Sequence, residues 1–258
     1  MTMADIRGST SGAEPIGLAE LLELAALQDR VDRKYVLPVA ALTPILVTLQ
    51  GRARTLQIDG RRDFDYESVY FDTPDVSCYR QSALRRRRRF KIRTRTYVDS
   101  AQRWLEVKTR DHRGHTIKQR QEHRHQATEL PETAREFIDH VVVDAELAGT
   151  WELSLEPTLT TTYRRRTLFL PGSASRVTVD TDLRWMAADG DHMDLPGVAI
   201  VETKTATTRP CEADRLLWRA GCRPSLISKY GTGLAALRPD LPSNKWHRVL
   251  NRYFWSAS

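Results

Sequence analysis

At 258 residues and 40% hydrophobic composition, the chain is long enough to bury a core, which excludes a disordered protein. Lys and Arg number 40 against 33 Asp and Glu, and the resulting charge of +7 favours an anionic partner such as nucleic acid, a phosphate compound or an acidic membrane. No signal-peptide pattern and no apolar run of about 18 residues occurs, so we expect neither export nor a membrane span. The three widely spaced cysteines are typical of a reduced, cytoplasmic setting.

The expected elements follow a loose N-terminal segment, residues 1–15, and most belong to one domain, residues 16–240. In the first half of the chain, periodicity predicts a helix at 16–27, a strand at 29–37, a helix at 38–49, strands at 55–58 and 66–73, a helix at 74–82 and a β-hairpin at 90–109 around a turn at 99–102. In the second half, it predicts a strand at 115–123, a helix at 130–148, strands at 159–170, 176–185 and 198–205, a helix at 212–220 and a short strand at 226–230. In the C-terminal tail, 241–258, residues 245–255 have the spacing of a docking helix.

Charged residues alternate with apolar ones along most of these strands. In the hairpin, Lys91, Arg93 and Arg95 share one face, and Ile92 and Val98 mark the other. The same i, i+2 pattern recurs at Arg30, Asp32 and Lys34; Glu106 and Lys108; Lys118, Arg120 and Glu122; Tyr163 and Arg165; Arg176, Thr178, Asp180, Asp182 and Arg184; and Glu202 and Lys204.

For any single strand a solvated face explains this alternation, but its recurrence over seven or eight strands favours a different interpretation. We predict an α+β fold: an antiparallel eight-stranded β-barrel whose apolar faces pack against helices and whose charged faces line a tunnel. Guanidinium groups bind phosphate oxygens in pairs, and interspersed carboxylates suit a divalent cation such as Mn²⁺ or Mg²⁺. A tunnel of this kind matches a linear chain of phosphates better than a nucleic-acid duplex.

Eight short motifs in this order resemble the VTC domain, the polyphosphate polymerase domain within the triphosphate tunnel metalloenzymes. The resemblance extends from about Asp29 to Leu237, and no one motif decides it. The motifs are DRKY (Asp32–Tyr35), SVYFDT (Ser68–Thr73), KIRTRTY (Lys91–Tyr97), LEVKT (Leu105–Thr109), YRRRTLF (Tyr163–Phe169), RVTVDTDL (Arg176–Leu183), VETKT (Val201–Thr205) and SKY (Ser228–Tyr230).

The resemblance implies a metal-dependent enzyme that transfers the γ-phosphoryl group of a nucleoside triphosphate to inorganic polyphosphate, without binding a specific nucleic acid. Carried over by position, the implied catalytic residues are Lys34, Arg93, Arg95 and Lys229. The implied metal ligand, for Mn²⁺ or Mg²⁺, is Glu202. The implied substrate-binding residues are Lys108, Lys118, Tyr163, Arg165, Arg176 and Ser228.

One departure bears on the reaction. Hydrolytic members of this superfamily carry two glutamates and a lysine alternating on the first strand, where this chain has Arg30, Asp32 and Lys34. The missing first carboxylate favours a polymerase over a triphosphatase. An inorganic triphosphatase or polyphosphatase, and a non-catalytic binder of polyphosphate or nucleic acid, remain the alternatives.

Other conspicuous residues have simpler explanations. We interpret the run Arg85–Arg89 as a solvated face or a tunnel entrance rather than a nucleic-acid site. The histidines His112, His115, His123 and His125 surround a polar turn, and we expect an exposed loop rather than a zinc site. We expect Cys211 and Cys222 to be buried thiols, and the aromatic residues of the tail to pack rather than to stack on bases.

Overall fold

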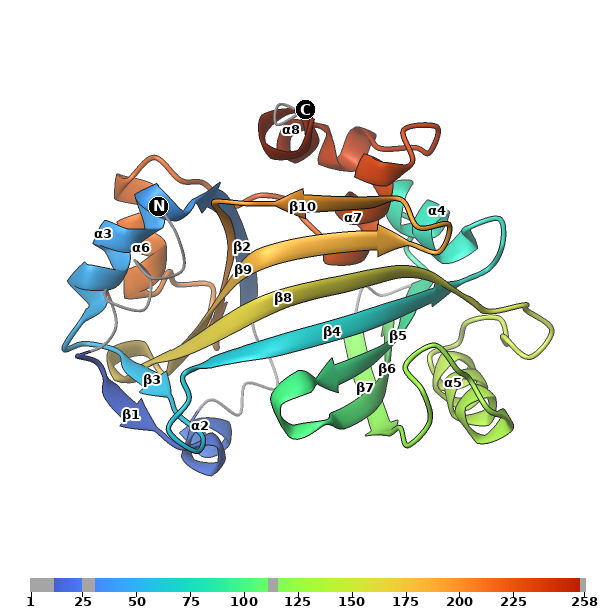
Figure 1. Ribbon diagram of the computed structural model, residues 1–258, viewed down its shortest axis with the longest axis horizontal. Helices are drawn as coiled ribbons and strands as arrows, with labels where there is room; N and C mark the ends of the chain where they lie inside the picture. The colour runs from blue at the N-terminus through green and yellow to red at the C-terminus, as the bar shows by residue number, and fades with distance from the viewer. Residues whose placement is uncertain (1–11, 25–30, 111–115, 256–258) are drawn as a thin grey trace. The chain divides into compact units, whose positions relative to one another are not determined.

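The computed structural model describes residues 12–24, 31–110 and 116–255 (Figure 1). Residues 1–11 of the expected N-terminal segment, together with Arg30, His112 and His115, lie outside this range. The main hydrogen-bonded path of the sheet in the described residues contains eight strands. Their order is β2 (Val31–Pro38), β11 (Val198–Thr205), β9 (Ser175–Ala187), β8 (Glu156–Leu170), β4 (Asp63–Asp72), β5 (Arg89–Tyr97), β6 (Gln102–Arg110) and β7 (Thr116–Glu122). Each ladder on this path whose register is known is antiparallel, which confirms the predicted α+β class with its antiparallel sheet and flanking helices.

The chain divides into two compact units. Unit 1 comprises residues 1–65, 163–183 and 194–227, and unit 2 comprises residues 66–162, 184–193 and 228–258. Strands β4 (Asp63–Asp72), β8 (Glu156–Leu170) and β9 (Ser175–Ala187) contribute to both units. Strands β2 and β7 are the two ends of the hydrogen-bonded order. Among the described residues no ladder joins them, so hydrogen bonds do not close the sheet into a barrel. The convergence of all predicted phosphate-binding residues in one tunnel therefore stays a prediction.

Unit 1 places two helices on the apolar face of three strands. Helices α3 (Val39–Leu49) and α6 (Glu212–Arg219) pack against each other and cover β2 (Val31–Pro38), β11 (Val198–Thr205) and the first part of β9 (Figure 1). Helix α3 presents Leu42, Leu46 and Leu49 to this core, and the chain leaves the helix at Gly51, whose φ of +76° suits glycine. The remaining elements are β1 (Glu14–Ile16), α2 (Leu18–Leu24), β3 (Arg54–Leu56) and the 3₁₀ turn η2 (Pro171–Ser173).

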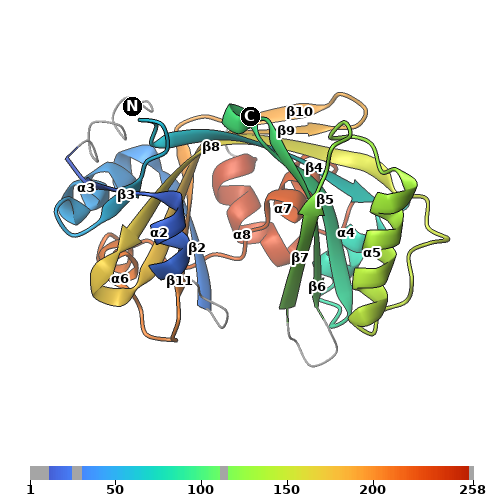
Figure 2. The same cartoon turned by 90° about the horizontal axis from the view of Figure 1, so that it is seen from below.

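Unit 2 is built on the predicted hairpin. Strands β5 (Arg89–Tyr97) and β6 (Gln102–Arg110) pair in register, joined by the 3₁₀ turn η1 (Val98–Ser100), and β7 (Thr116–Glu122) extends the sheet. Helix α5 (Glu132–Asp144) packs on their apolar face with Ile138, Val141 and Val142 (Figure 2). The expectation that Val98 shares the face of Ile92 is wrong, because Val98 has left the strand for the turn and is 52% exposed.

A second helical group in unit 2 consists of α4 (Ser77–Ala83), α7 (Lys229–Leu237), η3 (Asn244–Trp246), α8 (His247–Val249) and η4 (Leu250–Phe254). The last three form helical turns over residues 244–254, within the segment where the sequence predicts a helix. The strand expected at residues 226–230 is wrong, because Ser228 caps α7 and accepts a hydrogen bond from the Gly231 amide. A Cβ at Gly233 would lie 2.1 Å from the Trp185 ring, so this close approach requires glycine. Strand β10 (His192–Leu195), which pairs with β9, was not expected from the sequence.

Candidate functional site

The polar face of unit 1 arranges charges in cross-strand rows. In the ladder between β2 and β11, Lys34 lies opposite Glu202 and Asp32 lies opposite Lys204. In the ladder between β11 and β9, Lys204 lies opposite Arg176. Directly opposed residues have neighbouring side chains on the same sheet face. Three of the predicted site residues, Lys34, Arg176 and Glu202, are therefore brought together on this face.

Lys204 is a strongly perturbed basic group of this face, although only its neighbours were predicted as site residues. Its side chain is 14% exposed, and its Nζ lies 3.7 Å from Oε1 of Glu202. Burial lowers the pKa of Lys204 to about 8, and Arg176 and Arg165 add to that lowering while Glu202 and Asp32 oppose it. A phosphate anion placed here would favour the charged ammonium. The i, i+2 spacing of Lys204 with Glu202 was the available sequence signal.

Strand β8 adds an arginine whose charge is already paired. Arg165 donates from Nε and Nη2 to the two oxygens of Asp180, at 2.6 and 2.8 Å, and its guanidinium lies 5.2 Å from the centre of the Tyr163 ring. Asp180 is buried, so this bidentate pair fixes the guanidinium. Tyr163 and Arg165 thus lie together, as their spacing predicts.

Asp182 does not share the face of Asp180, and this corrects the expected alternation of β9. Asp182 has a φ of +50°, outside the extended region, and its carboxylate lies 3.6 Å from Arg164. Because Arg164 and Arg165 are consecutive residues of one strand, they point to opposite faces. The irregular backbone at Asp182 therefore moves its carboxylate to the face opposite Asp180.

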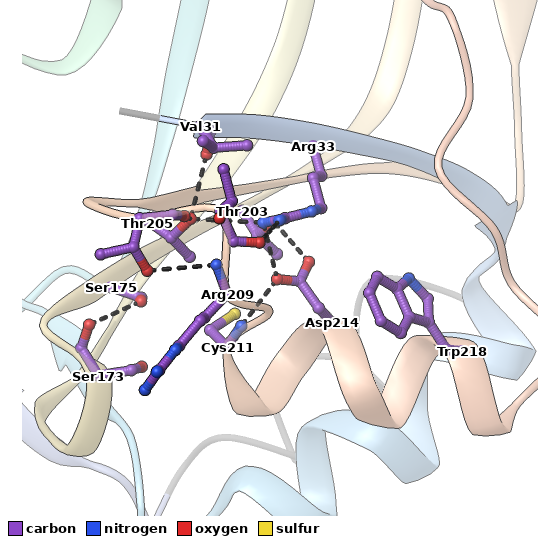
Figure 3. Close-up of polar contacts among 12 residues, drawn as sticks. Val31, Arg33, Ser173, Ser175, Thr203, Thr205, Arg209, Cys211, Asp214 and Trp218 are labelled. Carbon is purple, nitrogen blue, oxygen red and sulfur yellow. Dashed lines mark hydrogen bonds and ion pairs between the residues drawn. The ribbon is translucent and has the colours of Figure 1, made fainter. Parts of the chain in front are cut away.

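A buried carboxylate behind the polar face holds the strands of unit 1 together. Asp214 of α6 accepts hydrogen bonds from the Thr203 hydroxyl at 2.7 Å and from the Cys211 amide at 2.9 Å (Figure 3). The Tyr35 hydroxyl donates to the same carboxylate at 2.7 Å. Nη1 of Arg33 lies 3.4 Å from its second oxygen. Since Arg33 and Tyr35 flank Lys34, Asp214 fixes the backbone that presents Lys34. Sequence reasoning missed this residue, which lies 179 positions from Tyr35.

The polar face of unit 2 is centred on a single buried carboxylate. Glu106, 2% exposed, accepts hydrogen bonds from Nε and Nη2 of Arg93 at 2.8 and 2.6 Å and from Nζ of Lys118 at 2.9 Å. Nη1 of Arg95 lies 3.9 Å from the same carboxylate. Arg93 also donates to the Tyr70 hydroxyl at 3.0 Å. The structure thus brings together Arg93, Arg95 and Lys118 around Glu106, which the strand alternation placed on the charged face but the resemblance did not assign to the site.

The charges of this cluster perturb one another. Burial raises the pKa of Glu106, but Arg93, Arg95 and Lys118 outweigh burial and hold that pKa well below its usual range. Burial lowers the pKa of Lys118, and Arg93 and Arg95 lower it further against the opposing effect of Glu106. Three cations share one carboxylate, which leaves positive charge available to an anion.

Next to this cluster, three lysines form one row across the sheet. Lys108 lies opposite Lys91 in β5 and opposite Lys118 in β7. Lys91 donates to the Ser228 hydroxyl at 2.9 Å, so the cap of α7 adjoins this lysine row. Like charges directly opposite one another are destabilising, which makes the lysine row a favourable place for an anion. Lys229 follows Ser228 in the first turn of α7, and its carbonyl accepts from the Trp185 indole at 2.8 Å.

The described residues fit a divalent metal only if phosphate oxygens of the substrate supply part of its coordination. Within residues 12–24, 31–110 and 116–255, no group of three or more His, Cys, Asp or Glu side chains is arranged to hold a metal. Glu202 lies opposite Thr178, whose buried hydroxyl oxygen has no hydrogen-bond partner among the described residues. Mg²⁺ is commonly held by one or two carboxylates together with substrate phosphates. Glu202 and Thr178 fit that shared form, with phosphate oxygens completing the coordination.

The conspicuous histidines and cysteines stay outside these faces. His123 is buried, with its Nε2 3.1 Å from the Gln126 carbonyl, so the expectation of an exposed loop is wrong for this residue and holds for His125. Burial lowers the pKa of His123, which favours its neutral form. Cys211 is buried as expected, whereas Cys222 is half-buried.

The antiparallel sheet, with helices on its apolar faces and basic residues on its polar faces, defines an α+β protein. The family model of the VTC domain matches residues 29–238, and the chain belongs to this family. No curated protein is similar enough in sequence to match it. No helix in the described part of the chain is long and apolar enough to cross a bilayer.

Several solved structures are similar at low sequence identity. A candidate adenylyl cyclase from Hippeastrum, described as having a dominant triphosphatase activity, has 18% identity and a TM-score of 0.47, and the match covers 84% of this chain and 99% of that one. A candidate adenylate cyclase from Vibrio parahaemolyticus has 11% identity and a TM-score of 0.44 over 78% and 95% of the two chains. A protein from Pyrococcus horikoshii has 14% identity and a TM-score of 0.41 over 76% and 96%.

Proposed function

We propose that this protein is a metal-dependent phosphotransferase that moves the γ-phosphoryl group of a nucleoside triphosphate onto inorganic polyphosphate. The observation that carries the proposal is the excess of basic over acidic groups on the polar face of unit 2, in a chain of the VTC-domain family. There, Arg93, Arg95 and Lys118 share the single carboxylate of Glu106 beside the lysine row. A ligand of several linked phosphates would neutralise this surplus.

Phosphoryl transfer needs alignment and neutralisation of charge more than it needs covalent chemistry from the protein. Arg93 is fixed by Glu106 and Tyr70, so its guanidinium would bind phosphate oxygens without reorganising. Arg165 is fixed in the same way by Asp180. Lys34 and Lys204 add ammonium groups beside Glu202. The acceptor phosphate is itself anionic, so the reaction requires no strong general base.

Glu202 and the Thr178 hydroxyl are the groups that would hold Mg²⁺ or Mn²⁺ with the substrate phosphates. When bound, such an ion withdraws charge from phosphate oxygens. The remaining work falls to the protein's own cations, which orient the donor and the acceptor. Tyr163, Ser228 and Lys229 complete the proposed set of phosphate contacts.

The test is to incubate the purified protein with ATP and Mn²⁺ and to separate the products by size and charge. The proposal predicts a long anionic polymer that a polyphosphatase degrades. Free phosphate without polymer would identify a hydrolase instead. If neither product forms while tripolyphosphate raises the melting temperature, the protein is a binder. A heat-inactivated sample and the Glu202→Gln variant serve as controls for contaminating kinases.

A further inference from the structure

Basic side chains from three separate segments gather at one end of the hairpin in unit 2. Arg85–Arg89 lead into β5, Arg110 ends β6, and Lys245 belongs to η3; we call these residues the arginine cluster. Arg89 lies directly opposite Arg110 in the ladder. Nζ of Lys245 donates to the Ser82 carbonyl at 2.6 Å. The Ser82 carbonyl also accepts a hydrogen bond from the Arg85 amide at 3.3 Å, so Lys245 lies beside the start of the arginine run. Burial lowers the pKa of Lys245 to about 8, and Arg89, Arg85 and Arg110 lower it further.

The segment that carries the exposed arginines is held in a fixed conformation. The Arg86 amide donates to the Gln81 carbonyl at 2.9 Å, and Nη1 of Arg89 donates to the Arg86 carbonyl at 2.5 Å. Arg85 has a φ of +56°, a left-handed conformation that is costly for a residue with a side chain. The side chains of residues 86–88 are all exposed. Strained, hydrogen-bonded backbone thus presents consecutive guanidinium groups to solvent.

Within the described residues, no ion pair joins any member of the arginine cluster to a carboxylate. Like charges that lie opposite each other or close together reduce stability. A multivalent anion would remove this cost, whereas a purely solvated surface would gain nothing from gathering three distant segments.

The arginine cluster continues the polar face described above. Along β5, Arg89 shares a face with Lys91 and Arg93, and along β6, Arg110 shares a face with Lys108 and Glu106. The only carboxylate of these two runs is Glu106. Beyond Glu106, the face has two rows of positive residues only: Lys91 opposite Lys108, and Arg89 opposite Arg110. Each row lies roughly 7 Å further along the strands than the one before it, and residues 85–88 follow.

We propose that the arginine cluster is a docking site for a polyphosphate chain, and that it holds the part of the chain that extends beyond the phosphoryl-transfer residues. The proposal rests on the proposed function, since it concerns the same ligand. Its consequence is that long chains bind more tightly than short ones and dissociate less often between additions. The cluster would therefore control the length of the product rather than the rate of one transfer.

The surroundings of the cluster favour polyphosphate over other polyanions. Proteins that bind single-stranded nucleic acid offer aromatic faces to the bases, but the aromatic neighbours in sequence, Phe90 and Trp246, are both buried. Insertion into an anionic membrane would need exposed apolar groups, and Leu84 is the single such residue adjoining the run. Inorganic polyphosphate requires only closely spaced cations.

The test compares two variants that each lose three exposed arginines. The first carries Arg86→Gln, Arg87→Gln and Arg88→Gln, and the matched control carries Arg215→Gln, Arg219→Gln and Arg223→Gln in unit 1. Affinities for tripolyphosphate and for long-chain polyphosphate are measured over a range of salt concentrations. We expect the cluster variant alone to bind long chains at least ten-fold more weakly. If each lost contact releases counterions as on a single-stranded nucleic acid, its slope of log affinity against log salt falls by about 2.

Tripolyphosphate should bind the parent and both variants equally, and the cluster variant should make shorter polymer at an unchanged initial rate. Equal binding of long chains by both variants overturns the proposal, as does a parent that binds long chains no better than tripolyphosphate. Loss of binding to single-stranded DNA or anionic vesicles, with polyphosphate binding intact, assigns the cluster to another partner and also overturns it. If nothing binds tripolyphosphate, the proposed function itself fails. Arg110→Gln, on the opposite strand, provides a second variant should the triple change unfold the protein.

Discussion

In unit 1, cations of the polar face lie opposite or beside carboxylates: Lys34 faces Glu202, and Lys204 faces Asp32. Arg165 likewise holds Asp180. In unit 2, by contrast, three cations share Glu106, and the next row contains lysines alone. The same strand alternation thus produces a face with nearly balanced charge in unit 1, where four cations including Arg176 meet three carboxylates, and a face with surplus positive charge in unit 2. The balanced face suits a metal held jointly with phosphate, and the surplus face suits the phosphate chain.

The comparison predicts that the two glutamates differ most strongly in their effect on stability. Glu106→Gln removes the carboxylate that Arg93, Arg95 and Lys118 share, and removing one partner of a buried ion pair costs about 3–5 kcal/mol. Glu202→Gln should cost less, because the side chain of Glu202 is 16% exposed whereas that of Glu106 is 2% exposed. Urea unfolding of both variants at neutral pH measures the difference. Tripolyphosphate should restore much of the loss in Glu106→Gln.

The pH dependence of the same variant provides its control. The pKa of Glu106 in the folded protein is far below its ordinary value of 4.5, so its stabilising contribution is fully present above pH 4.5. That contribution is lost as the pH falls through the folded-state pKa. The free energies of unfolding of the parent and of Glu106→Gln should therefore converge at strongly acidic pH. A gap that stays constant down to the lowest measurable pH would show that packing, not charge, causes the loss.

Glu202→Gln should have the larger effect of the two glutamate variants when turnover, rather than stability, is measured. This change keeps the shape of the side chain and removes the charge that would help to hold the metal, so we expect turnover to fall by about 10²- to 10³-fold. Polyphosphate should still bind through the basic groups of unit 2. Kinetics over a titration of Mn²⁺, beside a binding isotherm, separate the two effects. Normal polymer synthesis at every metal concentration would remove Glu202 as the ligand and direct attention to Asp180 and Asp32.

Arg93→Ala should impair binding and turnover together, unlike Glu202→Gln. The change removes a guanidinium that Glu106 and Tyr70 hold in place, and we expect a loss of about 2–4 kcal/mol in transition-state stabilisation. The measurement is kcat/KM beside the dissociation constant for tripolyphosphate. Arg103→Ala in β6 is the matched control, because Arg103 bonds to Thr96 and the His125 carbonyl on the other face of the hairpin. Equal losses in both variants would indicate a general effect on the hairpin.

Local alternation made most of the fold predictable, because a strand with one apolar face fixes which residues point together. The hairpin register that joins Arg93 to Glu106 follows from its short turn. Three features had no local signal. Asp182 reverses its face through a positive φ, α7 replaces a strand because its glycines fit against Trp185 and Trp246, and Asp214 acts across long sequence separations.

The burial of Lys204 likewise depends on the assembled sheet, and it leads to the smallest expected effect. Its folded pKa of about 8 lies below the ordinary value of 10.5, so the folded protein carries fewer protons than the unfolded chain between these two values. The free energy of unfolding should therefore gain from this group as the pH rises from about 8 to about 10.5. Burial of the charged ammonium reduces stability below that window.

Phosphate binding should show the opposite dependence on pH. A bound anion favours the charged ammonium and raises the pKa of Lys204, so binding takes up a proton and weakens as the pH rises through about 8, at most ten-fold per pH unit. Lys204→Arg keeps a guanidinium charged throughout and should flatten this profile. Lys245 also has a pKa of about 8, so Lys245→Gln must be measured beside it. If Lys245→Gln flattens the tripolyphosphate profile and Lys204→Arg leaves it unchanged, the titrating cation belongs to the surplus face of unit 2, and the balanced face of unit 1 does not bind phosphate through Lys204.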